Sequence, residues 1–385
     1  MKIAITASSL LTPIEVVEQP VLVVEDGRIA AVGPRSQLPL PENARHYDFP
    51  NAILAPGFID IHIHGGSGHD VMEIDGSALA AIERGMLKHG VTSYLATTVT
   101  APLPATLKSL EHLGAAAHTK SNEAKSCLLG IHLEGPFISH AKRGVHPPKN
   151  LLRPSPELLR QFHEASGGAI RILTIAPELE GSLETIAEAS QLGIRSSVGH
   201  SNATFAEANA GIQAGARHAT HTFNAMRPLD HREPGILGAV LSDDSVTADL
   251  IADGVHVAPS MVKLFLSAKG TERAILITDA ISATDMPAGK YKLGEFVVEV
   301  KGSRCELEGK LAGSVLTLDR AVRNVMLYAS LTLQNSVRLV TLNPARLLGI
   351  TETRGMLAPG RIADVVVLTP LGEVITTMAA GKFPG

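Results

Sequence analysis

The sequence predicts an α/β fold: a (β/α)8 TIM barrel with a small β-sandwich-like domain formed by both chain ends. Three observations predict it. The central part of the 385-residue chain alternates strand-like runs with runs rich in Ala, Leu and Glu. Both ends contain only strand and turn signals. Several central strand-like runs end in His, Glu or Asp. Barrel enzymes carry their active-site residues at the carboxyl ends of the strands.

The two chain ends contain hairpin signals. Val21–Val24 and Ile29–Val32 flank an Asp-Gly turn, in which glycine supplies the positive φ that a tight turn needs. Near the other end, the β-branched run Ala363–Thr369 is followed by a turn and a second strand through Val374–Met378. The simplest arrangement pairs the two ends. We therefore expect residues 1–55 and 355–385 to form one small β domain.

The remaining residues, 56–354, are expected to form the barrel. The strand candidates are Gly57–Ile63, Ser93–Thr97, Leu128–Leu133, Ile170–Ile175, Arg195–Val198, His218–Thr220, Val246–Ile251 and Ala274–Ile277. The helix candidates are Ala78–His89, Pro104–Ala117, Glu157–Ala165, Leu183–Leu192, Phe205–Ala214 and Pro259–Lys269. An open doubly wound sheet is the alternative. Polar residues close many of the strands, whereas an open sheet gathers its site at one switch point, so the barrel is favoured.

Composition narrows the classes of partner. A net charge of −4 argues against binding to nucleic acid or to a membrane surface. Aromatic residues make up 3% of the chain and there is no Trp, so stacking on bases is disfavoured. Neither a signal peptide nor an apolar run of about 20 residues is present, so we expect a cytoplasmic protein. Cys127 and Cys305 are expected to be buried, reduced thiols.

The first central strand ends in His62–Ile63–His64. Side chains two residues apart lie on the same side of a strand, so both imidazoles are expected to face the barrel mouth and bind one metal ion. An isolated His-x-His is usually structural. Here it follows an apolar strand and precedes Gly65–Gly66, and this context favours metal ligands.

Three further strands end in residue types that bind Zn or Fe. The third strand of the expected barrel ends in Glu134. A carboxylate at the end of an apolar strand is costly to bury without a cation. The fifth ends in His200 and the sixth in His221. His218 lies three residues before His221, and we leave open whether it supports a ligand or is purely structural.

The eighth strand ends in Thr278–Asp279–Ala280. An Asp that faces a metal-activated water is placed to take its proton and to protonate a leaving nitrogen. The commoner use of Asp after a strand is to cap a helix. The metal ligands around it favour the catalytic role for Asp279.

Together these residues resemble the amidohydrolase superfamily, and more closely the N-acetylglucosamine-6-phosphate deacetylases. The resemblance covers nearly the whole chain. Its motifs are Pro56–Asp60, His132–Phe137, Val198–Ser201, Ala219–Met226, Arg232–Gly235, Ile251–His256, Thr278–Ala280 and Leu311–Ser314. Pro56–Asp60 marks only the superfamily. The motifs that point to the deacetylases are His132–Phe137, Ala219–Met226 and Ile251–His256.

The resemblance implies a divalent metal, Zn or Fe, with one or two ions per subunit. By this resemblance Glu134, His200 and His221 bind the main metal, and His62 and His64 bind a second. Some relatives replace the two histidines and use one metal. Because this chain keeps both, we expect a binuclear centre bridged by Glu134.

The resemblance also implies how the substrate is bound. Asp279 would be the general base and acid, and His146 would contact the reacting amide. His256, Asn224 and the backbone at Ala225 would contact a phosphate, with Arg232 reaching across a homodimer interface. From the residues alone, Arg232 is equally able to pair with Glu233 or Asp230. The basic loop that begins at Ser139 and continues to residue 150 is either a lid or an ordinary solvated loop.

The expected reaction is hydrolysis of the acetamido group of a small phosphorylated amino sugar, N-acetylglucosamine 6-phosphate, to glucosamine 6-phosphate and acetate. An N-acetylgalactosamine-6-phosphate deacetylase, or another amidohydrolase with the same metal site, is the nearest alternative. A non-catalytic barrel that serves as a scaffold is a further hypothesis. Such a protein would be expected to have lost ligands, and here every ligand position and Asp279 are present.

Overall fold

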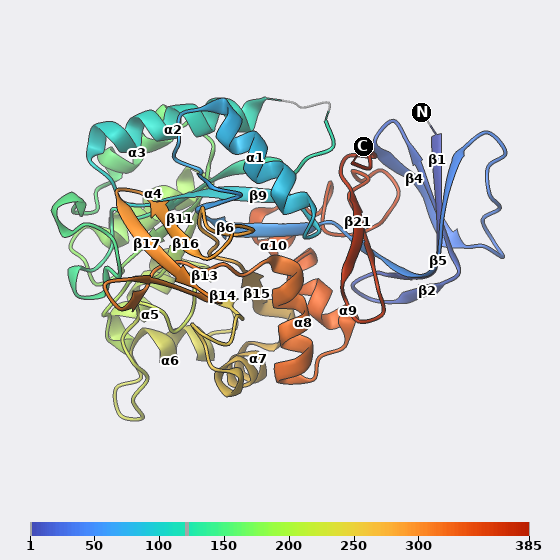
Figure 1. The fold of residues 1–385 in the computed structure, drawn as a ribbon. Helices are drawn as coiled ribbons and strands as arrows, with labels where there is room; N and C mark the ends of the chain where they lie inside the picture. Colours follow the sequence, from blue (N-terminus) through green and yellow to red (C-terminus); the bar gives the residue numbers. More distant parts are fainter. Residues whose placement is uncertain (1, 120–122, 385) are drawn as a thin grey trace.

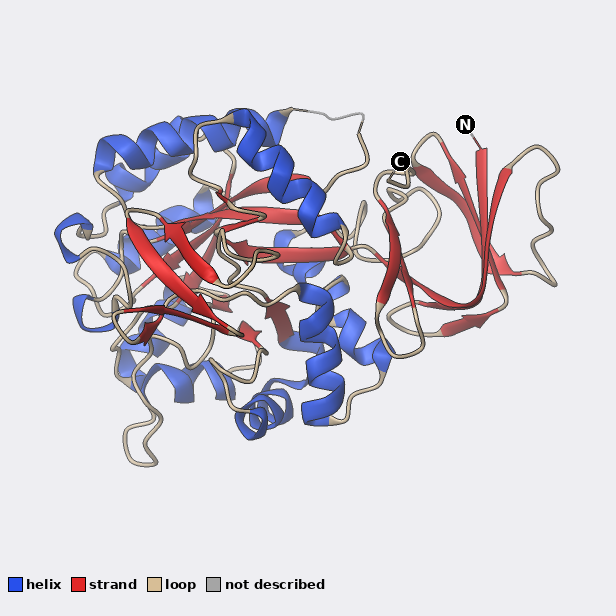
Figure 2. Ribbon diagram, viewed as in Figure 1, coloured by secondary structure: helices blue, strands red, loops and turns tan. Residues whose placement is uncertain are grey.

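The computed structural model describes residues 2–119 and 123–384. It contains a large part in which helices surround strands, and beside it a smaller part built from strands alone (Figures 1 and 2). Both chain termini lie on the smaller part or next to it (Figure 1). This is the predicted architecture, and the fold prediction is confirmed.

The large part is an eight-stranded parallel sheet in the order β15-β14-β13-β12-β11-β10-β9-β6. Its strands are β6 (Phe58–Ile63), β9 (Val91–Thr98), β10 (Cys127–Glu134), β11 (Ile170–Ile175), β12 (Arg195–Val198), β13 (His218–Ala219), β14 (Thr247–Ile251) and β15 (Ala274–Ile277). A parallel bridge between Ile63 and Ala280 joins the first strand to the end of the last and closes the barrel. All eight predicted strands are present.

Helices cover the outside of this sheet (Figure 2). They are α1 (Gly76–Leu87), α2 (Leu103–His118), α3 (Pro156–Ala165), α4 (Ser182–Gln191), α5 (Phe205–Ala214), α6 (Gly235–Ser242), α7 (Pro259–Arg273), α8 (Leu318–Ala329), α9 (Leu333–Arg338) and α10 (Leu342–Leu348). Local sequence sets where helices begin: the Ser155 hydroxyl accepts the N–H of Leu158, and Thr204 and Glu207 form a capping box. The six predicted helices are present, and α6, α8, α9 and α10 were not predicted.

The smaller part is a seven-stranded sheet made from both chain ends. Its strands are β1 (Lys2–Leu11), β2 (Val16–Glu18), β3 (Pro20–Glu25), β4 (Arg28–Pro34), β5 (Arg45–Pro56), β20 (Val365–Leu368) and β21 (Val374–Met378). The ends meet where β20 pairs antiparallel with β5. This sheet has its own apolar core, which includes Ile5, Leu22, Leu54 and Val367. The domain boundaries at residues 55 and 355 stay a prediction.

A four-stranded antiparallel sheet, which was not predicted, follows β15. Its strands are β16 (Gly289–Leu293), β17 (Phe296–Lys301), β18 (Arg304–Leu307) and β19 (Lys310–Leu311). Two short strands, β7 (Gly65–Gly66) and β8 (His69–Asp70), follow β6. The short helices η1 (His140–Lys142) and η2 (Pro148–Asn150) follow β10. Of these insertions, η1 and the four-stranded sheet contribute residues to the pocket described below.

The two cysteines differ in their exposure to solvent. Cys305 is buried, as expected, but Cys127 is exposed, so the prediction for Cys127 was wrong. Cys127 is the first residue of β10, where the strand enters the barrel and its side chain is not yet covered. Within residues 2–119 and 123–384, no helix combines the length and apolarity needed to cross a membrane.

Candidate metal centre and active site

A pocket of about 410 Å³ opens at the carboxyl ends of the barrel strands. Nine of the eleven predicted site residues line it: His64, Glu134, His146, His200, His221, Asn224, Ala225, His256 and Asp279. His62 does not line the pocket, because it is fully buried beneath it. Arg232 lies outside the pocket on an exposed loop.

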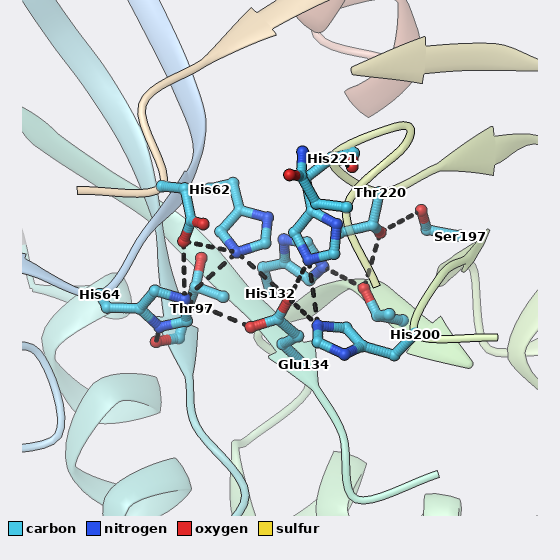
Figure 3. Close-up of polar contacts among 12 residues, drawn as sticks. His62, His64, Thr97, His132, Glu134, Ser197, His200, Thr220 and His221 are labelled. Atoms are coloured by element: carbon cyan, nitrogen blue, oxygen red, sulfur yellow. Dashed lines mark hydrogen bonds and ion pairs between the residues drawn. The ribbon is translucent and has the colours of Figure 1, made fainter. Parts of the chain in front are cut away.

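The five predicted metal ligands and the predicted base, Asp279, form two groups of three. His62, His64 and Asp279 make one group, and Glu134, His200 and His221 make the other. Within each group the ligand atoms lie within 4.8 Å of one another, and all six residues are buried. Side chains from β6, β10 and the segments after β6, β12, β13 and β15 therefore converge. Figure 3 shows the five predicted ligands among them.

The Glu134 carboxylate lies between the two groups (Figure 3). Its Oε1 atom lies 3.0 Å from Nε2 of His221 and 3.2 Å from Nε2 of His200. The same oxygen lies 3.4 Å from Nε2 of His62. Its Oε2 atom lies 3.2 Å from Nε2 of His64. This carboxylate is therefore placed to contribute to both groups.

The donor atoms fit divalent cations. The Nε2 atoms of His200 and His221 are 3.0 Å apart, and those of His62 and His64 are 3.3 Å apart. Two ligands that are each about 2.0–2.1 Å from a tetrahedral ion lie about 3.3 Å apart, so both spacings suit Zn²⁺ or a similar ion. Two imidazole nitrogens that face each other, with a carboxylate beside them, match the His and carboxylate ligands that such ions prefer.

Two of the imidazoles have their orientation fixed by a second hydrogen bond. His64 donates its Nδ1–H to the carbonyl of Thr97 at 3.0 Å, and His200 donates its Nδ1–H to the carbonyl of Lys142 at 2.9 Å. This tautomer leaves each Nε2 lone pair free for a metal, as is usual for metal-binding histidines. In contrast, the buried Nδ1 atoms of His62 and His221 have no hydrogen-bond partner among the described residues.

The electrostatics of the cluster also suit a cation. Burial alone would raise the pKa of Glu134, but His62, His146, His200 and His221 lower it well below its usual range. Burial alone would lower the pKa of His221, but Glu134 raises it to about 9. Without a metal the cluster therefore pairs a carboxylate with a bound proton, and a metal ion would take the place of that proton.

The backbone at three of these residues is in the left-handed region. The φ angles are +47° at His200, +30° at His221 and +51° at Asp279. Non-glycine residues adopt such angles at a cost of about 1–3 kcal/mol, and they do so mainly at functional sites. The strand ends are thus bent where the predicted ligands and the predicted base are presented.

Asp279 is held at the barrel closure. Its N–H donates to the carbonyl of His62 at 3.0 Å, and its carbonyl accepts the N–H of Ser314 at 2.8 Å. Its Oδ1 atom lies 3.2 Å from Nε2 of His64. Burial alone would raise the pKa of Asp279, but its contacts with His64 and His62 lower it. The group is therefore ionised at neutral pH and able to accept a proton.

His146 presents a hydrogen-bond donor to the pocket that Asp279 also lines. Its Nδ1 atom accepts the backbone N–H of Thr100 at 3.3 Å and lies 2.8 Å from the Thr100 hydroxyl. The proton of the neutral ring is therefore on Nε2, which lies 3.6 Å from Oε2 of Glu134. Gly135 allows this arrangement, because a Cβ at its φ of +76° would lie 2.1 Å from the Thr100 hydroxyl oxygen.

The predicted phosphate contacts lie on the wall formed by the segments after β13 and β14. His256 donates its Nδ1–H to Asp253 at 2.7 Å, which leaves its Nε2 for a ligand. Asn224 donates to the carbonyl of His221 at 3.2 Å, and Ala225 has a φ of +49°. Arg232 takes part in none of the ion pairs found within the described part of the chain, and its backbone N–H donates to Asp230.

The loop from Ser139 to residue 150 is attached to His200. Lys142 accepts the His200 Nδ1–H, and the N–H of Ser139 donates to the carbonyl of His200 at 2.9 Å. Residues 141–146 line the pocket. The loop therefore forms part of the pocket wall, and whether it also opens and closes as a lid stays a hypothesis.

His218 and His132 lie below the ligands and belong to neither group of possible ligands. His218 bonds through Nε2 to Asp249 at 2.9 Å. His132 donates from Nδ1 to the carbonyl of Ile61, and its Nε2 accepts the Thr174 hydroxyl at 2.7 Å. Burial and the nearby His62 lower the pKa of His132 well below its usual value. The network continues to Thr220 and Ser197 (Figure 3).

Sequence reasoning missed the residues that support this site. Thr97, Thr100 and Asp249 contact ligands or His146 through atoms that no short motif marks. It also missed Lys310, which lines the pocket from the unpredicted sheet. The sequence does contain a strand signal for that sheet. The second half of Phe296–Lys301 alternates apolar and charged residues, as a half-buried strand does.

Comparisons with known proteins identify the family of the chain. The model of the amidohydrolase family matches residues 53–383. The N-acetylglucosamine-6-phosphate deacetylase of Bacillus subtilis is 36% identical over 97% of this chain and 95% of its own. The N-acetylgalactosamine-6-phosphate deacetylase of Escherichia coli O157:H7 is 38% identical over 94% of each chain.

A solved structure shares the whole architecture. It is an Asp-to-Ala mutant of the N-acetyl-D-glucosamine-6-phosphate deacetylase from Mycobacterium smegmatis, in complex with N-acetyl-D-glucosamine-6-phosphate. It superposes with a TM-score of 0.92 at 35% identity and covers 99% of both chains. The resemblance inferred from the motifs is thus confirmed, and the chain is a hydrolase that belongs to the amidohydrolase family.

Proposed function

We propose that this enzyme hydrolyses the acetamido group of N-acetylglucosamine 6-phosphate to give glucosamine 6-phosphate and acetate. One observation carries the proposal: an ionised Asp279 lies against His64 in one of two buried groups of metal-ligand type, at a single pocket. The relatives described above act on phosphorylated N-acetyl sugars by name, and this supports the choice of substrate class.

The metal ligands we propose are Glu134, His200 and His221 for one ion, with His62 and His64 beside Asp279 for a second. When bound, a divalent ion such as Zn or Fe lowers the pKa of a water molecule and polarises the acetyl carbonyl. The Glu134 carboxylate lies within 3.4 Å of the Nε2 atoms of His62, His64, His200 and His221, and this position supports two ions rather than one.

Asp279 is proposed to act as base and then as acid. Its carboxylate accepts a proton from the water as the water oxygen bonds to the acetyl carbon. It then delivers that proton to the amide nitrogen as the carbon–nitrogen bond breaks. Without this transfer an amine anion would have to leave, which is very unfavourable. The lowered pKa of Asp279 supports the first of these roles.

His146 is proposed to stabilise the negative charge that develops on the acetyl oxygen. The contact with the N–H of Thr100 fixes the proton on Nε2, and that nitrogen lies toward Glu134 and the pocket. A fixed donor of this kind costs no reorganisation during the reaction and is worth about 10²–10³ in kcat.

The phosphate is proposed to bind at His256, at Asn224 and at the backbone of Ala225. Arg232 does not line this pocket in its own chain. The loop that carries it is exposed and therefore accessible to a second chain. We propose that a second copy of the chain supplies Arg232, so that the active enzyme is a homodimer. A local cation of this kind is needed because the net charge of the chain is −4.

Acetate release tests the proposal directly. We expect purified enzyme to release acetate from N-acetylglucosamine 6-phosphate faster than from N-acetylgalactosamine 6-phosphate. An Asp279→Asn variant should lose about 10²–10⁴ in kcat because proton transfer is lost. Asp285→Asn, in the same loop but outside the pocket lining, is the control. No acetate from either sugar would overturn the proposal, and a preference for the galactosamine derivative would move it to the epimer.

A further inference from the structure

The four histidines of the proposed metal centre are held in two different ways. His64 and His200 are fixed through their rings, by Nδ1–H bonds to the carbonyls of Thr97 and Lys142. The buried Nδ1 atoms of His62 and His221 have no such partner among the described residues. Each group contains one histidine of each kind. Something other than a ring hydrogen bond must therefore place His62 and His221.

A buried carboxylate holds the backbone of His221. The Oδ1 atom of Asp249 accepts the His221 N–H, and the Asp249 carbonyl accepts the N–H of Thr222 at 2.9 Å. The pairing of β13 with β14 has already ended at Ala219, so these bonds replace the strand ladder. They also hold His221 at its left-handed φ of +30°.

His218 completes this arrangement. Its Nε2 lies 2.9 Å from Oδ2 of Asp249, and its Nδ1 lies 2.8 Å from the hydroxyl of Thr247. His218 and Asp249 are both completely buried. A buried carboxylate is costly unless its oxygens are bonded, and here His218 satisfies one oxygen while the His221 N–H satisfies the other.

The same arrangement occurs at His62. Asp60 is 1% exposed, and its Oδ1 atom accepts the His62 N–H at 3.3 Å. Its Oδ2 atom accepts the hydroxyl of Thr278 at 2.6 Å. The pairing of β6 with β9 is irregular between Asp60 and Ile63, so the ladder is interrupted here too.

We infer that Asp249 and Asp60 are positioning residues for the metal ligands His221 and His62, one in each group, with His218 and Thr278 holding the carboxylates in place. The inference rests on the metal centre of the proposed function. It gives His218 a role at this centre without making it a ligand. It also distinguishes two ligands held through the backbone from two held through the ring.

Zinc affinity of the metal-stripped protein, measured by competition with a chromophoric chelator, tests the inference. Groups that orient metal ligands typically contribute 10–100-fold to affinity. We expect Asp249→Asn and Asp60→Asn each to weaken one zinc site by about that factor. His218→Gln, which keeps a donor toward Asp249, should weaken binding less than His218→Leu. Thr278→Val should weaken binding as Asp60→Asn does.

Asp319→Asn is the matched control, because Asp319 pairs with His89 at 3.1 Å in a His–Asp pair away from the pocket. It should lower the unfolding temperature while zinc affinity stays at the wild-type value. The inference is overturned if the Asp249, Asp60 and His218 variants also bind zinc as the wild type does. If Asp249→Asn does not fold, the two His218 variants and Thr278→Val decide the matter. A wild-type protein that binds zinc but releases no acetate would overturn the proposed function and leave this inference standing.

Discussion

His146 accepts the backbone N–H of Thr100 at its Nδ1 atom, and this single contact decides which ring nitrogen carries the proton. The donor that remains, Nε2, lies 3.6 Å from Glu134 at the base of the pocket. Because Thr100 lies just beyond Thr98, the last residue of β9, the barrel itself sets the tautomer of the residue proposed to stabilise the oxyanion.

Replacing His146 by Asn should lower kcat for acetate release by about 10²–10³, the usual effect of losing one oxyanion donor. Metal content should stay at the wild-type level, because His146 belongs to neither ligand group. Thr100→Val keeps the backbone N–H that fixes the tautomer, so its effect should be much smaller. Steady-state kinetics and metal analysis on both variants check this. Loss of metal from His146→Asn would show that the residue is a ligand instead.

His256 should affect binding of the phosphate and not the chemical step. Its Nδ1–H bond to Asp253 leaves Nε2 directed to a ligand, and a hydrogen bond to a charged group is worth about 1.5–3 kcal/mol. His256→Asn should therefore raise KM for the phosphorylated substrate by about 10–100-fold with little change in kcat. Asp253→Asn should have a smaller effect in the same direction.

Kinetics with unphosphorylated N-acetylglucosamine provide the control for this prediction. Both variants should match the wild type on that substrate, because no phosphate is present. An equal loss on both sugars would place His256 at another part of the substrate.

Arg232 provides a test of the proposed dimer. An Arg232→Ala subunit keeps Asp279, whereas an Asp279→Asn subunit keeps Arg232. If each site uses Arg232 of the neighbouring chain, a mixed dimer has one complete site. An equal mixture of the two inactive variants should then recover up to about a quarter of wild-type activity after subunit exchange. Light scattering gives the oligomeric state in parallel. No recovery from subunits that do exchange would show that Arg232 acts within its own chain or not at all.

His89 should make stability depend on pH in the alkaline range. Burial alone would lower its pKa, but Asp285 and Asp319 raise the pKa of His89 from 6.5 to about 9. A raised pKa stabilises the folded state below pH 6.5, and this contribution is lost as the pH rises through about 9. It amounts to up to about 3 kcal/mol.

Thermal unfolding of the wild type and of His89→Gln between pH 6 and pH 10 measures this contribution. The difference in unfolding temperature should be largest near pH 6 and should shrink by pH 10. His118→Gln is the control, since His118 bonds the Gly167 carbonyl and takes part in no ion pair found among residues 2–119 and 123–384. A difference that does not change with pH would mean that the His89 ion pairs contribute nothing to stability.

The barrel could be predicted closely because each strand carries its own signal. Ile170–Ile175, Arg195–Val198 and Ala274–Ile277 have the predicted bounds. The first and the last are short runs made mostly of apolar residues. The helix α6 was missed because it is apolar on all faces over eight residues, so no amphipathic period marks it. The strand β16 was missed because three of its five residues are polar and partly or fully exposed.

The ligands could be predicted because residue type and position at a strand end are both visible in sequence. The contacts that orient them could not. Asp249 lies 28 residues from His221, and Thr100 lies 46 residues from His146, so these pairs meet only through the closed barrel. His218 shows the limit most clearly: it lies three residues before His221, yet its ring bonds Asp249 whereas the ring of His221 faces Glu134.

The central claim is that acetate release depends on metal held at the two groups joined by Glu134. The most direct measurement strips the enzyme of metal with a chelator and follows acetate release from N-acetylglucosamine 6-phosphate while Zn²⁺ is added back. We predict no activity in the stripped enzyme and recovery that saturates at two ions per subunit, with His62→Asn saturating at one. Full activity in the metal-stripped enzyme would contradict the claim.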